Sequence, residues 1–416
     1  MNGLDAFEEL ESEVRSYVRG WPTVFDRAYG AKLWDENGRE YLDFFSGAGG
    51  LNYGHNHDAM IGALVRYLQS QGVLHSLDMA TTAKRDFLER FHEIILKPRG
   101  LSYRVMFPGP TGTNAVEASL KLARKVTGRA DIVSFSNAFH GMTLGSLALS
   151  GNVVKRESAG IPLEHQRTAP FDGELGESVD TIAVLDAMLA EEGASVAGVI
   201  VETIQGEGGL HTASFDWLQR LAECCKRHGC LLIVDDIQAG CGRSGSFFSF
   251  EPAGIEPDII CLSKSISGSG LPMALTLIRP ELDIWGPGEH NGTFRGNNAA
   301  FVTATEALRF WRDESLAEQV CRKSDIVRAE LDSIASQHEA MRATVRGRGL
   351  LIGLHTPIDG LASGVARAAF ERGLLIETSG GAASDVIKLM PPLTIEDEQL
   401  ERGLAILRDS VEVCAP

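Results

Sequence analysis

Lys264 is the residue whose surroundings most suggest chemistry. It lies in residues 257–270, PDIICLSKSISGSG, where the apolar run at 259–262 predicts a buried strand and the serines and glycines after the lysine predict a loop. Packing alone gives no reason for an amine at the end of such a strand. Because a lysine amine can form an imine with a carbonyl group, Lys264 is a candidate for covalent catalysis.

A second segment, residues 107–124 with the sequence FPGPTGTNAVEASLKLAR, has the composition of an anion site. A Gly/Pro loop leads into a predicted helix that follows Gly112 and Thr113. Glycine lets the backbone approach an anion, the helix start offers free N–H groups and Thr113 adds a hydroxyl, so the segment could cradle a phosphate. It lacks the G-K-[ST] of a nucleotide loop, and a plain helix cap remains the alternative.

Two further segments end predicted strands in polar or aromatic residues. LLIVDDIQ ends in Asp235 and Asp236, whose side chains point to opposite faces of a strand, and NAFHGMT places Phe139 and His140 after the strand IVSFS. Each has an ordinary alternative: solvated carboxylates, a core ring and a structural histidine. Together with Lys264 and the anion loop they supply an imine-forming amine, a partner for a pyridinium nitrogen, a stacking face and a phosphate site. Pyridoxal 5'-phosphate (PLP) requires these four parts.

The elements that must position these residues alternate between strands and helices over about residues 103–278. Short apolar runs separated by amphipathic helices predict an α/β fold with a mostly parallel sheet covered by helices on both faces. Ligands of such sheets bind outside the carboxyl ends of the strands. We therefore expect the polar residues that end these strands to converge there: Glu202, Asp235, Asp236, Gln238 and Lys264.

The regions on either side of this section predict a smaller α+β domain. KLWDENGREYLDFF is typical of a hairpin with its turn at Asn37-Gly38, and the chain after about Glu306 alternates long helices with RGRGLLIGLH and DVIKLMPPLTI. Residues 1–60 are expected to contribute to this small domain, residues 61–310 to form the large cofactor-binding domain, and residues 311–416 to form the C-terminal small domain.

Composition excludes several classes of partner. The chain has 416 residues and a formal net charge of −17, with no basic run, which disfavours nucleic acid and anionic membranes. The first residues lack the pattern of a signal peptide and no apolar run is long enough to span a membrane, so a cytoplasmic protein is expected. The seven cysteines show no C-x-x-C spacing, so neither a metal site nor a disulfide framework is expected.

Several segments resemble one family closely and in order: PGPTGTNAVEASLKLAR, AFHGMT, QGEGG, DDIQAGCGRSG and SKSISG. These match the motifs of the class III (ω-type) PLP-dependent aminotransferases, and the resemblance covers nearly the whole chain. Within that family, GLNYGHN, TAKRDF, ILKPRGL, NGTFRGN and IETSG are most similar to the diaminobutyrate–2-oxoglutarate transaminases of ectoine biosynthesis. The resemblance implies fold type I, with a large PLP-binding domain and a smaller α+β domain.

The resemblance also implies roles for individual residues. Lys264 matches the lysine that holds the cofactor covalently and then moves the substrate proton, and Asp235 matches the partner of the pyridine nitrogen. Gln238 matches a residue near the phenolic oxygen, while Phe139 matches the ring stacked on the pyridine, with His140 beside it. The phosphate loop corresponds to Gly112 and Thr113, and the residue that reaches the neighbouring subunit's phosphate corresponds to Thr293. An obligate homodimer with shared active sites is therefore expected.

The substrate side departs from the family pattern. Where many relatives have an arginine that grips the carboxylate of glutamate, this chain has Lys388, which keeps the charge but loses the two-pronged geometry. Glu207 matches the residue that pairs with that arginine when an ω-amine is bound. Leu51 and Tyr53 match a loop on the substrate side, with ordinary packing as the alternative. Asp236 stands where many relatives have glutamate, and we expect its side chain to point away from the cofactor.

The function implied is a ping-pong transamination through an aminated form of the cofactor. L-glutamate would give its amino group to the enzyme and leave as 2-oxoglutarate, and L-aspartate 4-semialdehyde would then take it to give L-2,4-diaminobutyrate. The alternatives are another ω-aminotransferase, acting on 4-aminobutyrate, ornithine or a polyamine, and a PLP-dependent aminomutase or phospho-lyase. The pathway served could lead to an osmolyte, a siderophore or an antibiotic.

Overall fold

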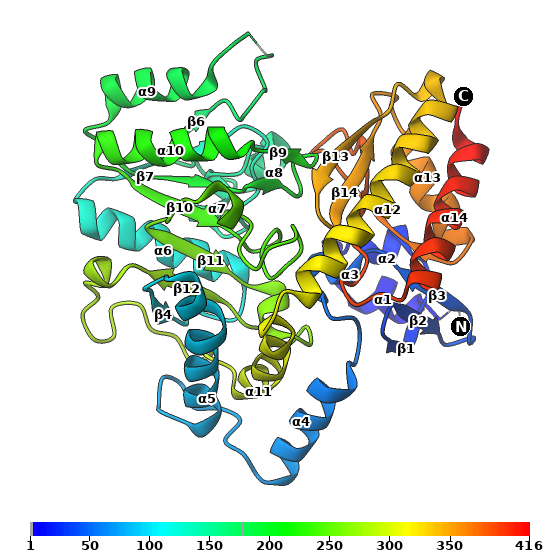
Figure 1. The fold of residues 1–416 in the computed structure, drawn as a ribbon, viewed down its shortest axis with the longest axis horizontal. Helices are drawn as coiled ribbons and strands as arrows, with labels where there is room; N and C mark the ends of the chain where they lie inside the picture. The colour runs from blue at the N-terminus through cyan, green and yellow to red at the C-terminus, as the bar shows by residue number, and fades with distance from the viewer. Residues whose placement is uncertain (1–2, 177) are drawn as a thin grey trace.

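The larger of the two lobes is built on a seven-stranded sheet (Figure 1). This computed structural model describes residues 3–176 and 178–416. Strands β11, β10, β7, β5 and β6 run parallel, whereas β12 is antiparallel to both of its neighbours, so the predicted mostly parallel sheet is confirmed. In spatial order the strands are β4 (Arg104–Met106), β12 (Leu275–Ile278), β11 (Ile259–Leu262), β10 (Leu231–Asp235), β7 (Val196–Val201), β5 (Asp131–Phe135) and β6 (Gln166–Ala169).

Helices cover both faces of this sheet because alternate strand residues point to opposite sides. In β10, Ile233 lies in the cluster formed with α6 (Gly112–Thr127), whereas Leu232 and Val234 lie in the cluster that contains the apolar side chains of α10 (Phe215–His228). Ser214 caps α10 by accepting from the N–H of Trp217 at 3.3 Å. Beside α10 lies α9 (Thr181–Glu192), the outermost helix on that side (Figure 1).

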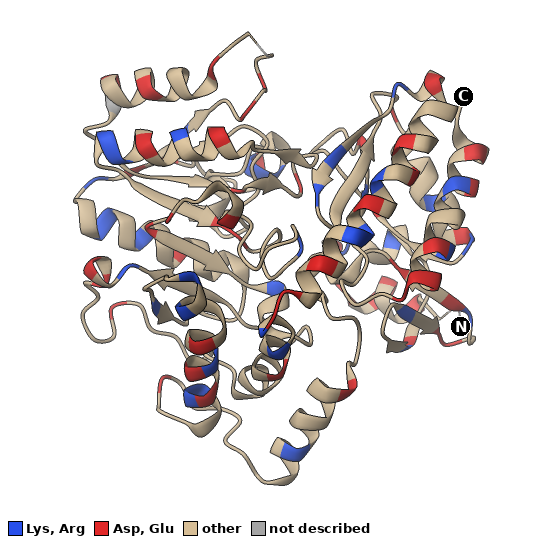
Figure 2. Cartoon of the chain, viewed as in Figure 1, with Lys and Arg blue, Asp and Glu red and all other residues tan. Residues whose placement is uncertain are grey.

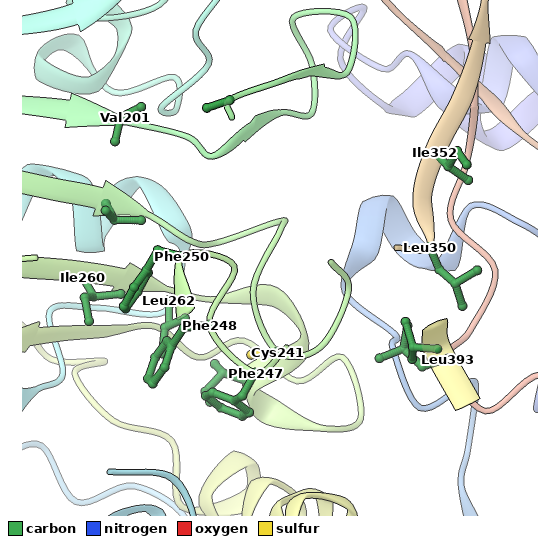
Figure 3. Close-up of a cluster of buried hydrophobic side chains, with 14 of the residues drawn as sticks. Val201, Cys241, Phe247, Phe248, Phe250, Ile260, Leu262, Leu350, Ile352 and Leu393 are labelled. Carbon is green, nitrogen blue, oxygen red and sulfur yellow. The ribbon is translucent and has the colours of Figure 1, made fainter. Parts of the chain in front are cut away.

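The smaller lobe contains a four-stranded antiparallel sheet in the order β13 (Thr344–Arg348), β14 (Leu351–His355), β17 (Val386–Leu389) and β16 (Glu377–Ser379). Its helices are α12 (Ser315–Gln337), α13 (Leu361–Glu371) and α14 (Asp397–Cys414). One hydrophobic cluster continues from the large sheet into this lobe. Figure 3 shows Phe247, Phe248 and Leu262 near the strands of the large sheet, and Leu350, Ile352 and Leu393 on segments of the smaller lobe.

The N-terminal segment joins the smaller lobe. Strands β1 (Phe25–Tyr29), β2 (Lys32–Asp35) and β3 (Glu40–Asp43) form an antiparallel sheet that β15 (Leu374–Leu375) extends in parallel. The turn between β2 and β3 uses Gly38 at φ 81°. Two short helices, α1 (Asp5–Leu10) and α2 (Tyr17–Gly20), precede these strands. The domain boundaries at residues 60 and 310 stay a prediction.

Three further helices pack together at the edge of the large lobe: α4 (Asp58–Gln69), α5 (Thr82–Phe91) and α11 (Asn298–Ala307) (Figure 1). In the view of Figure 2, acidic and basic residues are interspersed along the helices of both lobes. Within the described ranges no helix has the length and apolar character required to cross a membrane.

Candidate active site

The backbone around Lys264 is held by contacts from a distant loop. The lysine begins a 3₁₀ turn, Lys264–Ser267, directly after β11, and its φ of 52° lies in the left-handed region, which L-residues rarely adopt. The hydroxyl of Ser265 donates to the carbonyl of Gly49 at 2.7 Å and accepts from the N–H of Asn52 at 3.0 Å. Residues 46–52, which include α3 (Ser46–Gly49), thus fix the turn that presents the amine.

Burial lowers the pKa of the Lys264 amine below its ordinary value. Among the charges that act on it, Glu207 raises the pKa and Lys388 lowers it, and the loss of hydration prevails. A lowered pKa increases the neutral fraction of the amine, which is the nucleophilic form.

Asp235 and Asp236 point in opposite directions at the end of β10. The Nδ1 of His140 donates to Oδ2 of Asp235 at 2.8 Å, whereas Oδ2 of Asp236 accepts from the N–H of Ser249 at 3.0 Å. Burial lowers the pKa of His140, but the hydrogen bond and the charge of Asp235 outweigh it and raise the pKa overall. Burial raises the pKa of Asp236 to about 7. The expectation that Asp236 turns away from Asp235 agrees with this geometry.

The loop after β5 brings Phe139 and His140 beside the ends of the central strands. The N–H of Phe139 donates to Oε2 of Glu202 at 2.9 Å, and Glu202 follows directly after β7. Burial raises the pKa of the Glu202 carboxyl. Glu202 is therefore a structural support of the loop that carries the candidate stacking ring.

The start of α6 has free backbone donors. Thr111 and Asn114 form a reciprocal capping box, but no described partner accepts from the N–H of Gly112 or Thr113. The Oγ1 of Thr113 shares hydrogen bonds with Oγ of Ser146, at 2.7 Å, in α7 (Leu144–Ala148). At Gly112 a Cβ would stand only 3.0 Å from the side chain of Ile237, so a larger residue would crowd this end of the helix.

Lys388 lies fully buried between two carboxylates. Its Nζ is 2.8 Å from Oε1 of Glu207 and 2.8 Å from Oε1 of Glu377. Glu377 and Lys388 face each other directly in the register of β16 and β17, which explains their pairing. The hydroxyl of Tyr17 donates to Oε2 of Glu377 at 3.2 Å. We call Glu207, Lys388 and Glu377 the Lys388 triad.

The charges within the Lys388 triad shift the pKa of each member. Burial raises the pKa of Glu207, but the positive charges of Lys388 and Lys264 outweigh it and lower the pKa overall. For Glu377 burial prevails and raises the pKa. Burial lowers the pKa of Lys388, but its two carboxylate partners raise it overall, so the lysine keeps its charge.

Gln238 connects the Lys388 triad with the loop of residues 46–52 that holds the Lys264 turn. Its Nε2 donates to the carbonyl of Ala48 at 3.0 Å and to Oε1 of Glu207 at 3.4 Å. Its Oε1 is buried and has no hydrogen-bond partner within the part of the chain that the structure describes.

A cavity of about 920 Å³ opens beside these residues. Tyr17, Phe139, Glu207 and Glu377 line it together with Lys155 of α8 (Val153–Glu157) and residues 379–382. Phe139 and Glu207 thus face the same space. Sequence reasoning assigned no role to Tyr17, Glu377 or Lys155, and the only signal for Glu377 was its place in the IETSG segment.

Phe139 and Glu207 belong to this cavity lining, and the other ten predicted site residues, Lys264 and Asp235 included, lie outside it. Thr293 is exposed, and no hydrogen bond described here joins it to the other candidate residues of its own chain. Tyr53 is buried, where its hydroxyl accepts from Nε1 of Trp311 at 2.8 Å, a contact typical of packing. Leu51 is half-buried and lies beside Gly270, in the loop after the Lys264 turn.

Comparison with known proteins identifies the family. Residues 15–411 match the model of the class III aminotransferases. The chain belongs to this family. It is 58% identical to a diaminobutyrate–2-oxoglutarate transaminase from Halalkalibacterium halodurans, over 98% of this chain and 96% of that protein. It is 57% identical to a protein of the same name from Streptomyces coelicolor, over 99% of this chain and 98% of that protein.

Solved structures of other aminotransferases share the fold. The ornithine aminotransferase of Toxoplasma gondii superposes with a TM-score of 0.85 at 28% identity, covering 98% of this chain and 93% of that one. An amine transaminase from an uncultivated Pseudomonas species, in its PLP-bound form, gives a TM-score of 0.88 at 26% identity and full coverage of both chains. The predicted fold type I architecture of this class III aminotransferase is confirmed.

PLP is the cofactor of this class III aminotransferase, and its residues fit that group. Nε2 of His140 and Oε1 of Gln238 are buried and have no hydrogen-bond partner in the described residues. Polar atoms of a bound ligand would supply the missing hydrogen bonds. The first N–H groups of α6 offer an anion site, and the Lys264 amine, with its lowered pKa, is suited to covalent attachment. When bound, PLP supplies an electron-withdrawing ring that stabilises a carbanion at the substrate's reacting carbon.

Proposed function

We propose that this enzyme transfers the amino group of L-glutamate to L-aspartate 4-semialdehyde, which yields 2-oxoglutarate and L-2,4-diaminobutyrate. The observation that carries the proposal is the identity of 52–58% with diaminobutyrate–2-oxoglutarate transaminases over nearly the whole chain. The Lys388 triad supports it. An enzyme that alternates between a dicarboxylate and an ω-amine needs a cation that a protein carboxylate neutralises when the ω-amine is bound and that pairs with the substrate when the dicarboxylate is bound.

The proposal gives each cofactor-side residue one task. Lys264 holds the cofactor, and the free N–H groups of Gly112 and Thr113 bind its phosphate. The carboxylate of Asp235, kept in place by His140, favours protonation of the ring nitrogen. Two further residues complete the shell: Phe139 packs against the ring, and Gln238 lies near the phenolic oxygen.

Proton transfer falls to Lys264. The side chain is buried and its pKa is lowered, so its Nζ can be neutral when the substrate is in place. Neutral Nζ takes the proton from the substrate's reacting carbon, and the negative charges of Glu207 and Glu377 favour the ammonium that results. The same charges limit how far the pKa falls, so the amine can both accept and release a proton.

The Lys388 triad binds the α-carboxylate of glutamate. In the structure Glu207 neutralises Lys388, which suits an ω-amine substrate whose reacting carbon carries no carboxylate. When glutamate binds, its α-carboxylate takes the place of Glu207. Glu377 stays paired with Lys388 across the β16–β17 register and keeps the ammonium in position. Leu51 and Tyr53 act by packing: Leu51 lies beside the loop after the Lys264 turn, and Tyr53 is buried against Trp311.

We also propose a homodimer in which Thr293 reaches the phosphate site of the partner subunit. Its exposure on residues 291–294 supports this assignment. A cytoplasmic location and a place in ectoine-type biosynthesis belong to the same proposal.

A panel of amino donors and aldehydes with the purified holoenzyme tests the function. Formation of 2-oxoglutarate from glutamate with aspartate 4-semialdehyde as acceptor is expected, as is the reverse reaction with diaminobutyrate. Ornithine, 4-aminobutyrate and a polyamine serve as competing donors. Turnover of any of these at a higher kcat/KM than diaminobutyrate would refute the substrate assignment, and one-to-one conversion of 2-oxoglutarate to glutamate excludes an aminomutase or a lyase.

A further inference from the structure

The two amino-acid substrates of the proposed reaction share a carboxylate at the same distance from the reacting carbon. In glutamate the side-chain carboxylate is three bonds from C2, and in diaminobutyrate the α-carboxylate is three bonds from C4. One cation at a fixed place in the cavity could therefore serve both half-reactions. This inference rests on the proposed function.

Lys388 is not suited to hold this shared carboxylate. In the proposed reaction it binds the other carboxylate of glutamate, the α-carboxylate, and in the structure it faces Glu207 and Glu377 at 2.8 Å each. During the diaminobutyrate half-reaction Glu207 remains paired with it, so its charge stays covered. The shared carboxylate therefore needs a different positive group in a cavity that is lined by three glutamates, Glu207, Glu371 and Glu377.

Three other basic residues line the cavity: Arg19, Lys155 and Arg367. Arg19 donates to the carboxylate of Glu13, and half of its side chain is exposed. Arg367 is exposed on α13. Lys155 is half-buried, and among the described residues no carboxylate lies within ion-pair distance of its Nζ. Of the three, Lys155 is the half-buried one, and it has no carboxylate partner among the described residues.

The Lys155 ammonium lies directly over the ring of Phe139, 4.6 Å from the ring centroid. A cation over an aromatic face is attracted by the ring quadrupole, which compensates part of the hydration that the ammonium loses. The contact keeps the side chain directed over the ring that faces the cavity rather than into solvent. Because Phe139 is the candidate stacking ring, Lys155 lies one side chain away from the proposed cofactor site.

The backbone around Lys155 is fixed to the same loop. Oδ1 of Asn152 caps α8 by accepting from the N–H of Lys155 at 3.0 Å. The N–H of Gly151 donates to the carbonyl of Ala138 at 2.7 Å. A Cβ at Gly151 would stand only 2.4 Å from the backbone N of Asn137, so only glycine allows this approach. The start of α8 and the loop before Phe139 are therefore held together.

We infer that Lys155 is a specificity-determining residue whose ammonium binds the shared carboxylate, the side-chain carboxylate of glutamate and the α-carboxylate of diaminobutyrate. Recognition by one charged hydrogen bond favours substrates with this spacing over amines of the same chain length without a carboxylate.

The test compares two donors that differ only in the carboxylate, L-2,4-diaminobutyrate and 1,3-diaminopropane. In the holoenzyme, Lys155→Met should lower kcat/KM for diaminobutyrate by about 30-fold, the loss expected for one charged hydrogen bond, and leave the value for diaminopropane within about threefold. Binding of glutarate, a dicarboxylate of the same spacing that cannot react, should weaken by a similar factor in calorimetry. Lys155→Arg should restore most of both losses.

Arg156→Met is the matched control, since it removes the same charge from the same helix outside the cavity lining. It should leave the donor ratio and glutarate binding unchanged. Equal losses for both donors in Lys155→Met, with weakened cofactor absorbance or a lower melting temperature, would show a structural role and overturn the inference. An unchanged donor ratio would also overturn it. A wild-type enzyme that turns over neither glutamate nor diaminobutyrate would instead refute the proposed function.

Discussion

Replacing Lys388 with methionine tests whether the Lys388 triad is an electrostatic unit. Methionine has a similar length and an apolar end, so Lys388→Met leaves the carboxylates of Glu207 and Glu377 in a buried environment without their shared cation. The loss of one partner from a buried ion pair typically costs about 4 kcal/mol of unfolding free energy. For a chain of 416 residues this corresponds to a decrease of roughly 5 °C in melting temperature.

The effect should depend on pH in a defined direction. In the wild type the folded pKa of Glu207 is lowered below its ordinary value of 4.5, so its contribution to stability is present above that value and is lost as the pH falls through the folded pKa. Lys388→Met removes this contribution and leaves two buried carboxylates with raised pKa values. The deficit relative to wild type should therefore be largest at pH 8 and smallest near pH 5, where protonation neutralises the carboxylates.

Differential scanning calorimetry of wild type and variant at pH 5 and pH 8, at equal protein and cofactor concentrations, measures this deficit. Lys323→Met is the control, because Lys323 is also buried but its Nζ donates to the carbonyl of Leu393 at 2.9 Å instead of pairing with carboxylates. Its deficit should be similar at both pH values. A deficit for Lys388→Met that is equal at both pH values, or absent, would refute the electrostatic reasoning.

The remaining predictions concern the cofactor and the substrate switch. Lys264→Ala should give a folded protein that binds PLP weakly and does not transaminate, as measured by absorbance and single-turnover assays; substantial residual activity would contradict the role of the lysine. Asp235→Asn should lower kcat by about 100-fold or more, since a charged hydrogen bond of about 3 kcal/mol is lost, and a smaller loss in stopped-flow half-reactions would count against the ring-nitrogen assignment. Glu207→Gln removes the carboxylate that neutralises Lys388, so the ratio of kcat/KM for glutamate to kcat/KM for diaminobutyrate should rise about tenfold. This factor corresponds to one ion pair of about 1.4 kcal/mol. An unchanged or lower ratio would argue against replacement of Glu207 by the substrate carboxylate.

Local sequence patterns predicted the parts of the site that lie at strand ends. The apolar run before Lys264 and the run before Asp235 are strands of one sheet, and their hydrophobic side chains leave only the last residues free for chemistry. The alternation of side chains along a strand was sufficient to separate Asp235 from Asp236. Glycine and threonine before a predicted helix were sufficient to indicate the free N–H groups of α6.

Contacts between residues distant in sequence needed the tertiary structure. His140 and Asp235 are 95 residues apart, and no local pattern relates them. Glu377 pairs with Lys388 because of the register of β16 and β17, which depends on packing of the whole sheet. Lys155 lies in a five-residue helix, and no local sequence pattern distinguishes it from an ordinary surface lysine.

By itself, the sequence determined the fold class and the cofactor, and it predicted the amine that would hold this cofactor, because these depend on hydrophobic periodicity and on residue types at strand ends. Only the tertiary structure decided that Lys388 is shared by two carboxylates and that Lys155 lies over Phe139 with no carboxylate partner among the described residues. The charge state of a buried group depends on every neighbour that folding brings within a few ångströms, and chain order does not specify those neighbours.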